Sequence, residues 1–326
     1  MRVNKIIKYP MRLLLLFFEN LGPFGIKVAT AQVLFLLSEH IGSNSVRQKI
    51  YRFKHETVLG YLEKEFASQI KTNAEIASKE RITPATPFRI WQCWWQGSDH
   101  LSGITKLCTN SVRVNSRKIE IVFITLDNYA DYIQLPEHVI EKVNNGTISL
   151  TFFSDILRVN LLKKYGGLWI DATVLLTDKI MDEIITRDFI TCPEKNDDLY
   201  FVSKYKWNTS ILGGKVNLPI FSFVANMFND YWAKENKIID YYLFDYLIAL
   251  GYRNVPKIRE EIDSHPFINP QKHKLQNLLN KPYSENEWRQ VTSDTSMFKL
   301  SRKVDYDSMV SGKKTFYQVL LERFEA

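Results

Sequence analysis

Cysteine is scarce in this sequence. It has three among 326 residues, Cys93, Cys108 and Cys192, and no two of them form a CxxC pair. A small, odd number of scattered cysteines argues against a disulfide framework and favours a reducing compartment, in which the thiols are buried. The HExxH, P-loop and GxGxxG motifs are also absent, so the sequence gives no sign of the metal and phosphate sites that these motifs define.

Long apolar runs are missing from the N-terminal region. Leu13–Phe18 is six residues long and is followed by Glu19, whereas a membrane-spanning helix needs about 20 mostly apolar residues. Val28–Leu37 is too short for the same reason. We therefore expect neither a signal peptide nor a spanning helix. Four cations precede the first acid: Arg2, Lys5, Lys8 and Arg12.

This basic and apolar segment has the pattern of a helix that lies on an anionic membrane surface. The alternative is that its apolar residues pack on each other or on the rest of the chain. Residues 46–76 continue with a charged helical pattern, and Pro84 and Pro87 then break regular structure. We expect a helical N-terminal extension, residues 1–80, before a main domain of residues 84–326. The expected inner face of the extension consists of Tyr51, Val58, Tyr61, Leu62 and Phe66.

The composition is that of an ordinary globular protein, with 45% hydrophobic and 24% charged residues. This content excludes wholesale disorder, and the length is enough for one large core or two modest ones. The formal charge is +7, but the main domain has no basic stripe and no recognised nucleic-acid motif. We therefore expect no nucleic-acid partner.

The main domain begins with alternating strand and helix patterns. Residues 88–95 are rich in aromatic residues and isoleucine, which is typical of a strand. Ile119–Thr125 is a nearly continuous apolar run, typical of a strand buried on both faces. Asp99 or Ser102 can begin a helix between these two patterns, and Pro136 can begin another helix after the second. The alternation predicts an α/β fold with a mixed sheet flanked by helices.

One stretch, residues 152–176, combines a helix, a turn and a strand. Ser154 is expected to cap the helix, and Gly166-Gly167 to end it. Residues 168–170 then have the pattern of a short buried strand. Asp171 stands at the carboxyl end of that strand, where α/β proteins usually bind ligands.

Beyond this stretch the patterns are weaker. Residues 188–192 and 200–202 are possible strands, and residues 219–231 and 238–250 are expected to be amphipathic helices. A final helical pattern covers residues 316–324.

Two pairs of polar residues suggest chemistry. Asp171 and Thr173 are two apart, so they point the same way on an extended segment. Such oxygen ligands suit Mg²⁺ or Mn²⁺, which often takes one or two carboxylates plus phosphates; the alternative is that Asp171 is a turn or capping carboxylate. Asp155 and Arg158 share a helix face, which fits either a functional site or an ordinary ion pair.

Two blocks of sequence carry a family resemblance. The first is IWQCWWQG at residues 90–97, and the second combines SDILR at 154–158 with YGGLWIDATV at 165–174. They resemble the DXD-type segment of sugar-nucleotide glycosyltransferases, and more narrowly the capsular polysaccharide synthesis branch related to glycosyltransferase family 32. The resemblance implies a GT-A-like sheet and a divalent ion, Mn²⁺ or Mg²⁺, held by Asp171 and Thr173. Thr173 stands where the DXD pattern has its second Asp.

The resemblance also implies a donor site for a nucleotide sugar. Asp155 would bind sugar hydroxyls and Arg158 the diphosphate or sugar, next to a catalytic Asp171. Trp91, Trp94, Trp95 and Gln96 begin the part of the sheet that would hold the base and ribose. Because side chains alternate along a strand, at least one of these tryptophans is expected in the core, and the sequence leaves open which one meets a nucleotide.

Other residues have two interpretations each. Asp127, at a strand end, could bind ribose or uracil, or it could be structural. Trp207 and Asn208 could shape the sugar or acceptor pocket, or they could pack within a loop. Lys299 is either a phosphate contact or a solvated surface residue, and Phe298 before it replaces a His of the resembled family.

The resemblance implies an activity as well. It would be the transfer of a hexose from a UDP-sugar to a lipid-linked capsular or exopolysaccharide unit, with retention at the anomeric carbon. The enzyme would be cytoplasmic and peripheral at the inner face of the plasma membrane. A catalytically silent scaffold of a polysaccharide assembly complex is the alternative, and the missing second Asp favours it.

Overall fold

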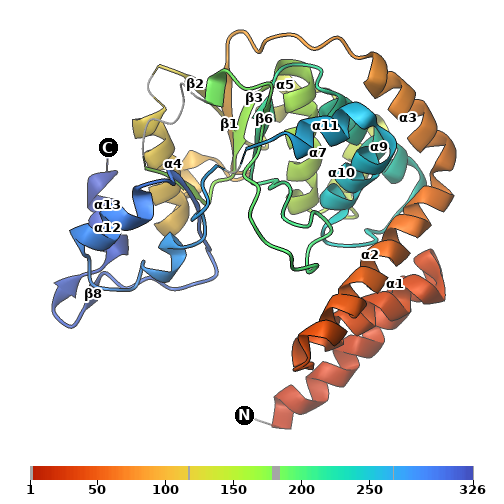
Figure 1. Cartoon of the computed structure of the whole chain (residues 1–326), viewed down its shortest axis with the longest axis horizontal. Coiled ribbons are helices and arrows are strands. Elements are labelled where there is room, and N and C mark those ends of the chain that lie inside the picture. The colour runs from red at the N-terminus through yellow and green to blue at the C-terminus, as the bar shows by residue number, and fades with distance from the viewer. Residues whose placement is uncertain (1–2, 117, 178–183, 267, 326) are drawn as a thin grey trace.

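The structure is a computed structural model that describes residues 3–116, 118–177, 184–266 and 268–325, with side chains from residue 9 onward. Arg2 and the side chains of Lys5 and Lys8 therefore lie outside the described residues. A central β-sheet has helices on both faces, and long N-terminal helices project from one side (Figure 1). The expected α/β fold, with a mixed sheet, flanking helices and a helical N-terminal extension, is confirmed.

The main sheet has five strands in the order β2-β1-β3-β6-β5. Strand β1 (Arg89–Cys93) is parallel to β2 (Glu120–Ile124) and to β3 (Gly167–Ile170). Strand β6 (Ile211–Gly214) is antiparallel to both β3 and β5 (Phe189–Ile190). The sheet is therefore mixed, and the carboxyl ends of β1 and β3 meet at one edge.

One strand prediction and one burial prediction are wrong. Residues 200–202 form turns, not a strand, because the loop around them curves back on itself with Lys204 and Tyr205 at positive φ. The expectation that β2 is buried on both faces also fails. β2 lies at the edge of the sheet, so Val122 and Ile124 are buried while Ile121 and Phe123 remain partly exposed.

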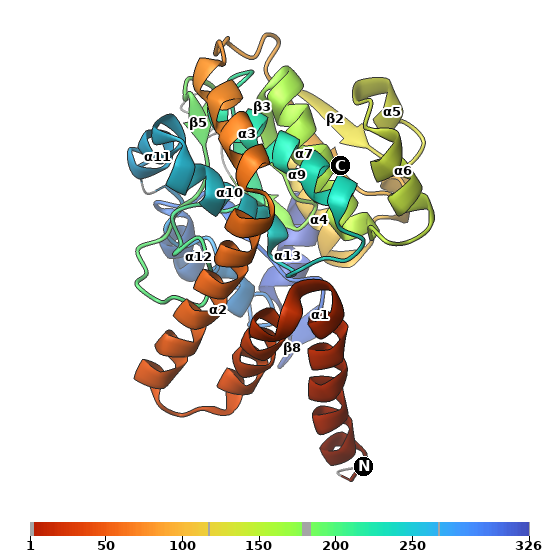
Figure 2. The ribbon, with the colours of Figure 1, turned by 90° about the vertical axis from the view of Figure 1, so that its right-hand side faces the viewer.

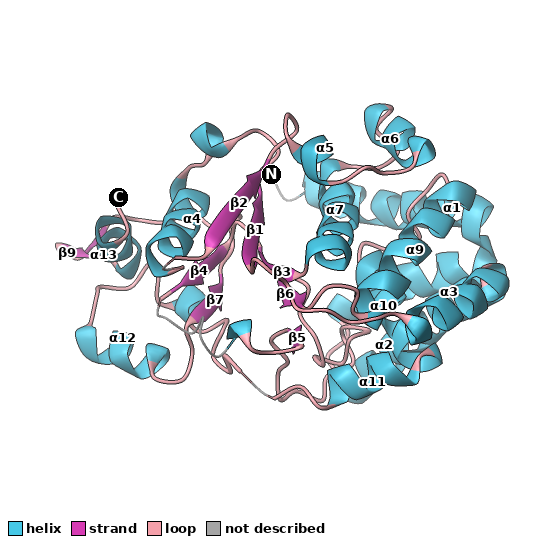
Figure 3. Cartoon of the chain, turned by 90° about the horizontal axis from the view of Figure 1, so that it is seen from above, coloured by secondary structure: helices cyan, strands magenta, loops and turns pink. Residues whose placement is uncertain are grey.

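Helices cover both faces of the sheet, as the view from above shows (Figure 3). On one face α7 (Leu150–Tyr165), α9 (Pro219–Lys234) and α10 (Leu243–Asn254) bury the largest hydrophobic cluster against Trp91 of β1. On the other face α4 (Gly103–Asn115) packs on the sheet and on the C-terminal region. The helix expected from residue 238 begins at Leu243 instead.

Helix α7 begins five residues earlier than its sequence suggests. Its cap is Ser149, whose Oγ accepts a hydrogen bond from Phe152 N at 3.4 Å. Ser154 lies inside the helix, where its hydroxyl donates to Leu150 O at 2.9 Å. The predicted cap at Ser154 is therefore wrong, because burial of Phe153 extends the helix toward the N-terminus.

The turn from α7 into β3 depends on two glycines. Gly166 has φ 61° and Gly167 has φ 89°, a region that side chains with a Cβ rarely occupy. A Cβ on Gly167 would lie 2.4 Å from Arg89 O. The predicted glycine stop is confirmed, and Gly167 also lets β3 approach β1 closely.

The N-terminal extension consists of α1 (Val3–Leu37), α2 (Asn44–Glu65) and α3 (Ala67–Lys79), and α1 and α2 project together from the main body (Figure 2). Helix α1 is kinked at Gly25. The expected inner face is confirmed for its buried members, Tyr51, Val58, Leu62 and Phe66, while Tyr61 is partly buried. Val58, Leu62 and Phe66 join the same hydrophobic cluster as α9 and α10, and Tyr61 packs against it.

Helix α1 also bears on the expectation that no helix spans a membrane. The segment Tyr9–His40, which contains most of α1, is long and apolar enough to do so, and most of its apolar part is not buried. Length and composition are weak evidence, because signal sequences and soluble core helices meet the same criterion.

The C-terminal region returns to the centre of the molecule. Strand β7 (Met297–Lys299) pairs antiparallel with β4 (Val174–Leu176), which directly follows the predicted site. The remaining elements are short: α5 (Tyr129–Tyr132), α6 (Glu137–Asn144), α11 (Pro256–Asp263), α12 (Glu285–Thr292), β8 (Met309–Val310), β9 (Lys313–Lys314) and α13 (Phe316–Arg323).

Candidate active site

A cleft of about 1050 Å³ opens beside the carboxyl ends of β1 and β3. Its walls come from α7, from the segment after β3, from the loop before β6, from the start of α10 and from the segment after β7. Lys299 lines this cleft. So do seven other residues proposed from the sequence: Gln96, Asp155, Arg158, Asp171, Thr173, Trp207 and Asn208.

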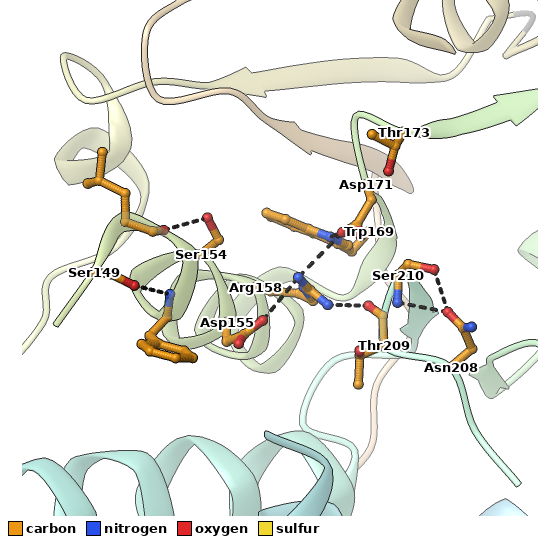
Figure 4. A network of polar contacts seen from close by, with 12 residues as sticks. Ser149, Ser154, Asp155, Arg158, Trp169, Asp171, Thr173, Asn208, Thr209 and Ser210 are labelled. Atoms are coloured by element: carbon orange, nitrogen blue, oxygen red, sulfur yellow. Dashed lines mark hydrogen bonds and ion pairs between the residues drawn. The ribbon is translucent and has the colours of Figure 1, made fainter. Parts of the chain in front are cut away.

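Asp171 lies next to Trp169 and Arg158 (Figure 4). Its Oδ1 accepts from Trp169 Nε1 at 2.8 Å, and its Oδ2 accepts from Lys299 Nζ at 2.7 Å. Arg158 Nη2 is 3.4 Å from Oδ1. Burial alone would raise the pKa of Asp171, but Lys299 and Arg158 together bring the pKa below its usual value. The carboxylate is therefore ionised at neutral pH and lies between two cations.

Arg158 connects α7 to the loop before β6. It forms an ion pair with Asp155 at 3.1 Å and donates to Thr209 O. Its guanidinium lies 4.8 Å from the centre of the Trp169 ring and 5.4 Å from that of Phe244. Stacked and bonded on several sides, it is held in one orientation.

The Asp155–Arg158 ion pair considered from the sequence is formed, and Arg158 reaches Asp171 at the same time. Burial raises the pKa of Asp155 to about 7, although Arg158 acts in the opposite direction. Near neutral pH this carboxyl is thus divided between its protonated and ionised forms.

Lys299 is part of the site, not a solvated surface residue. Its ammonium donates to Thr173 Oγ1 at 2.7 Å as well as to Asp171. It reaches them because β7 pairs with β4, with Lys299 opposite Val174. Asp171 and Lys299 are 128 residues apart, so no local pattern could have identified the contact.

The divalent ion implied by the resemblance can be compared with this arrangement. Mg²⁺ and Mn²⁺ need several oxygen ligands around one point, but Asp171 offers one carboxylate whose two oxygens already accept hydrogen bonds. Among the described residues, no group of three or more His, Cys, Asp and Glu could hold a metal ion. The ammonium of Lys299 lies between Asp171 and Thr173. The residues as arranged do not fit a resident ion, and the entry of an ion with a diphosphate stays a prediction.

Two proposed donor residues lie away from the cleft. Trp91 is fully buried, donates from Nε1 to Gly166 O at 2.8 Å and packs on Tyr132 and Tyr165. Its side of β1 faces the core, so a nucleotide-binding role is wrong for Trp91. Asp127 is exposed in the turn after β2 and does not line the cleft, so the structure favours its structural interpretation.

Other aromatic residues do border the cleft. Trp94 is partly buried, and the guanidinium of Arg302 lies 5.7 Å from its ring centre. Trp207 donates from Nε1 to Asp245 Oδ1 at 2.8 Å. Asn208 Oδ1 accepts from Ser210 N at 2.9 Å, which shapes the loop before β6.

Asp245, in the first turn of α10, was not identified from the sequence. Burial raises the pKa of Asp245 to about 6, although the hydrogen bond from Trp207 acts to lower it. A single Asp within an amphipathic helix carries no local sign of a site, and only the fold brings it to the cleft.

The fold and the site define an α/β protein with a charged cleft at the carboxyl ends of its parallel strands. A family model described as "Capsular polysaccharide synthesis protein" matches residues 39–320, so the chain belongs to that family. The family membership expected from the two sequence blocks is confirmed.

The other comparisons with known proteins add little to the family assignment. The solved structure "PaToxG Glycosyltransferase" is similar at 13% identity with a TM-score of 0.37, covering 78% of this chain and 99% of that one. The comparison with curated proteins finds no match.

Proposed function

We propose that the protein is a glycosyltransferase that moves a hexose from a nucleotide sugar, a UDP-sugar, to a lipid-linked acceptor of capsular or exopolysaccharide synthesis. The observation that carries the proposal is the group formed by Asp171, Arg158 and Lys299 in the cleft beside β3. Membership of the capsular polysaccharide synthesis family supports it.

The chemistry requires that a leaving diphosphate be stabilised. The bond between the anomeric carbon and the diphosphate oxygen breaks, and its electron pair goes to the diphosphate. Arg158 and Lys299 lie where fixed cations can stabilise that charge. For a retaining reaction, as the resemblance to family 32 implies, the acceptor oxygen attacks from the same face. Its proton passes to the leaving phosphate oxygen.

The remaining groups suit the rest of the donor. Trp94 presents a partly exposed ring on which a base can stack, with Gln96 beside it in the cleft. Asp155 and Asn208 offer polar groups to sugar hydroxyls. Trp207 and Asp245 are hydrogen-bonded to each other and also line the cleft, so they suit contacts with the sugar or the acceptor.

The N-terminal helix supports a location at the cytoplasmic membrane surface. Met11, Leu14, Leu15 and Phe18 of α1 are each more than half exposed. Their spacing puts them on one helix face, with Arg12 exposed among them. An apolar face next to basic residues suits an interface with anionic lipid, where a lipid-linked acceptor would be held.

Sugar transfer by the full-length protein tests the proposal. We expect wild-type protein to release UDP from one UDP-sugar of a panel. Asp171→Ala should lower that rate by at least about 100-fold, because the site loses the group that aligns Arg158 and Lys299. Asp127→Ala, an exposed carboxylate outside the cleft, is the matched control and should keep full activity. Equal activity of Asp171→Ala and wild type would contradict the proposal, and binding without any turnover would favour the scaffold.

A further inference from the structure

We propose that Lys299 is a built-in cation for the donor diphosphate and takes the role that the family resemblance gives to a divalent ion. This inference rests on the proposed transferase function. It implies that the donor binds without Mg²⁺ or Mn²⁺.

The position of the ammonium is the first argument. Lys299 Nζ lies 2.7 Å from Asp171 Oδ2 and 2.7 Å from Thr173 Oγ1, the two residues expected to hold the ion. A lysine ammonium has three N–H donors, so two are used here and one remains. The side chain is 28% exposed and lines the cleft, so the remaining donor is available to a phosphate oxygen.

The backbone holds Lys299 in place, which is the second argument. Leu300 N donates to Thr173 O at 2.8 Å, and Lys299 N donates to Lys272 O at 2.9 Å. Phe298, on the opposite face of β7, is fully buried in the C-terminal hydrophobic cluster. Because side chains alternate along a strand, the burial of Phe298 turns Lys299 toward the cleft.

The charges of the site give the third argument. Asp171 is paired with two cations, Arg158 and Lys299, so these three residues carry a net positive charge without a metal. Arg302 and Lys303 also line the cleft, as do the acids Asp155, Glu194 and Asp245, so the positive excess concerns the charges next to Asp171 and not the whole cleft. A divalent ion bound to Asp171 and Thr173 would have to displace the ammonium or lie against it, and both are unfavourable.

Calorimetric titration of the full-length protein with UDP, in EDTA and in Mn²⁺, tests the inference. We expect the wild-type dissociation constant to agree between the two conditions within about threefold, since no ion takes part. Lys299→Met should weaken binding in EDTA by about 30-fold or more, as expected when one partner of a close charge pair is removed. Mn²⁺ should restore part of that loss by entering the vacated position. Lys313→Met, in the distant strand β9, is the matched control and should bind as wild type does.

Wild-type binding that disappears in EDTA and returns with Mn²⁺ would overturn the inference and leave the transferase proposal intact. Absence of binding in both conditions, for UDP and for other nucleoside diphosphates, would overturn both proposals. If Lys299→Met does not fold, Lys299→Arg keeps the charge and should still bind UDP in EDTA. A requirement of Lys299→Arg for Mn²⁺ would count against the inference.

Discussion

His55 shows how burial fixes the charge of a single residue. It lies in α2, where its Nε2 is 3.0 Å from Leu199 O and 3.2 Å from Tyr200 O, and its Nδ1 is 2.8 Å from Tyr246 Oη. Carbonyl oxygens only accept, so Nε2 carries the proton and Nδ1 accepts from the Tyr246 hydroxyl. Burial, followed by the charge of Lys54, lowers the pKa of His55 to about 4. The folded protein therefore keeps this ring neutral.

A dependence of stability on pH follows from His55. Between about pH 6.5 and 4 the unfolded chain binds a proton at this residue and the folded chain does not, so the free energy of unfolding falls as the pH falls. The loss approaches about 3 kcal/mol near pH 4. Urea unfolding at pH 4.5 and at pH 7 gives the free energy of unfolding at each pH. The difference between the two values should be smaller for His55→Gln than for wild type. His40→Gln, at an exposed residue, should leave the difference unchanged; the same difference in His55→Gln would contradict the argument.

Individual site residues differ in how far sequence could identify them. Asp171 was found because a glycine pair, a short strand and an acid follow one another locally. The sequence could not decide between Trp91 and Trp94, because alternation shows which residues share a face but not which face is buried. Lys299 and Asp245 depend on contacts with distant segments, and a single sequence carries no signal for these.

At the scale of helices and strands, the close approach of β3 to β1 predicts how glycine substitutions change stability. Gly167→Ala should destabilise the protein by about 2–4 kcal/mol, because it adds a strained φ and a clash with a backbone oxygen that cannot move. Gly146→Ala shares the positive φ, 80°, but has open space around the added carbon; it should cost only about 1 kcal/mol.

A third glycine completes this series. Gly60→Ala lies on the exposed side of α2 with nothing nearby, so it should stabilise the protein by about 0.5–1 kcal/mol. Thermal unfolding of the three variants measures the order of their stabilities. Equal effects at Gly167 and Gly146 would show that the close strand contact contributes nothing.

Most helices and strands could be predicted from local patterns. The residues at which they begin and end could be predicted less well. The strands β1, β2 and β3 and the helix α9 were expected because apolar runs and breakers mark them. The start of α7 was misplaced because Ser149 and Ser154 are equally good caps, and the burial of Phe153 decides between them. The pairing of β4 with β7 was not foreseen, since three-residue strands leave almost no pattern.

At the scale of the whole molecule, α1 leads to the prediction about the membrane. Its exposed face should bind vesicles that contain anionic lipid, and Leu14→Ser with Phe18→Ser should weaken binding by at least about tenfold, because two apolar side chains no longer insert. Sedimentation with vesicles measures this binding.

The control for α1 is Met309→Ser, an equally exposed apolar residue in the strand β8. It should bind vesicles as wild type does. Undiminished binding of the α1 variant would remove the support for the membrane location. Phe24 and Val28, further along α1, are buried in the main cluster, so the helix is anchored to the body that it would tether.

The pairing of β4 with β7 also determines when the site can exist during synthesis. A ribosome that has made the chain as far as Leu176 has completed Asp155, Arg158 and Asp171, but not the cation that meets them. Because Lys299 comes 128 residues after Asp171, a prematurely terminated chain could fold much of its sheet and still lack the second positive charge. If Lys299 binds the donor diphosphate as proposed, fragments that end before β7 would bind the donor more weakly than the full-length protein.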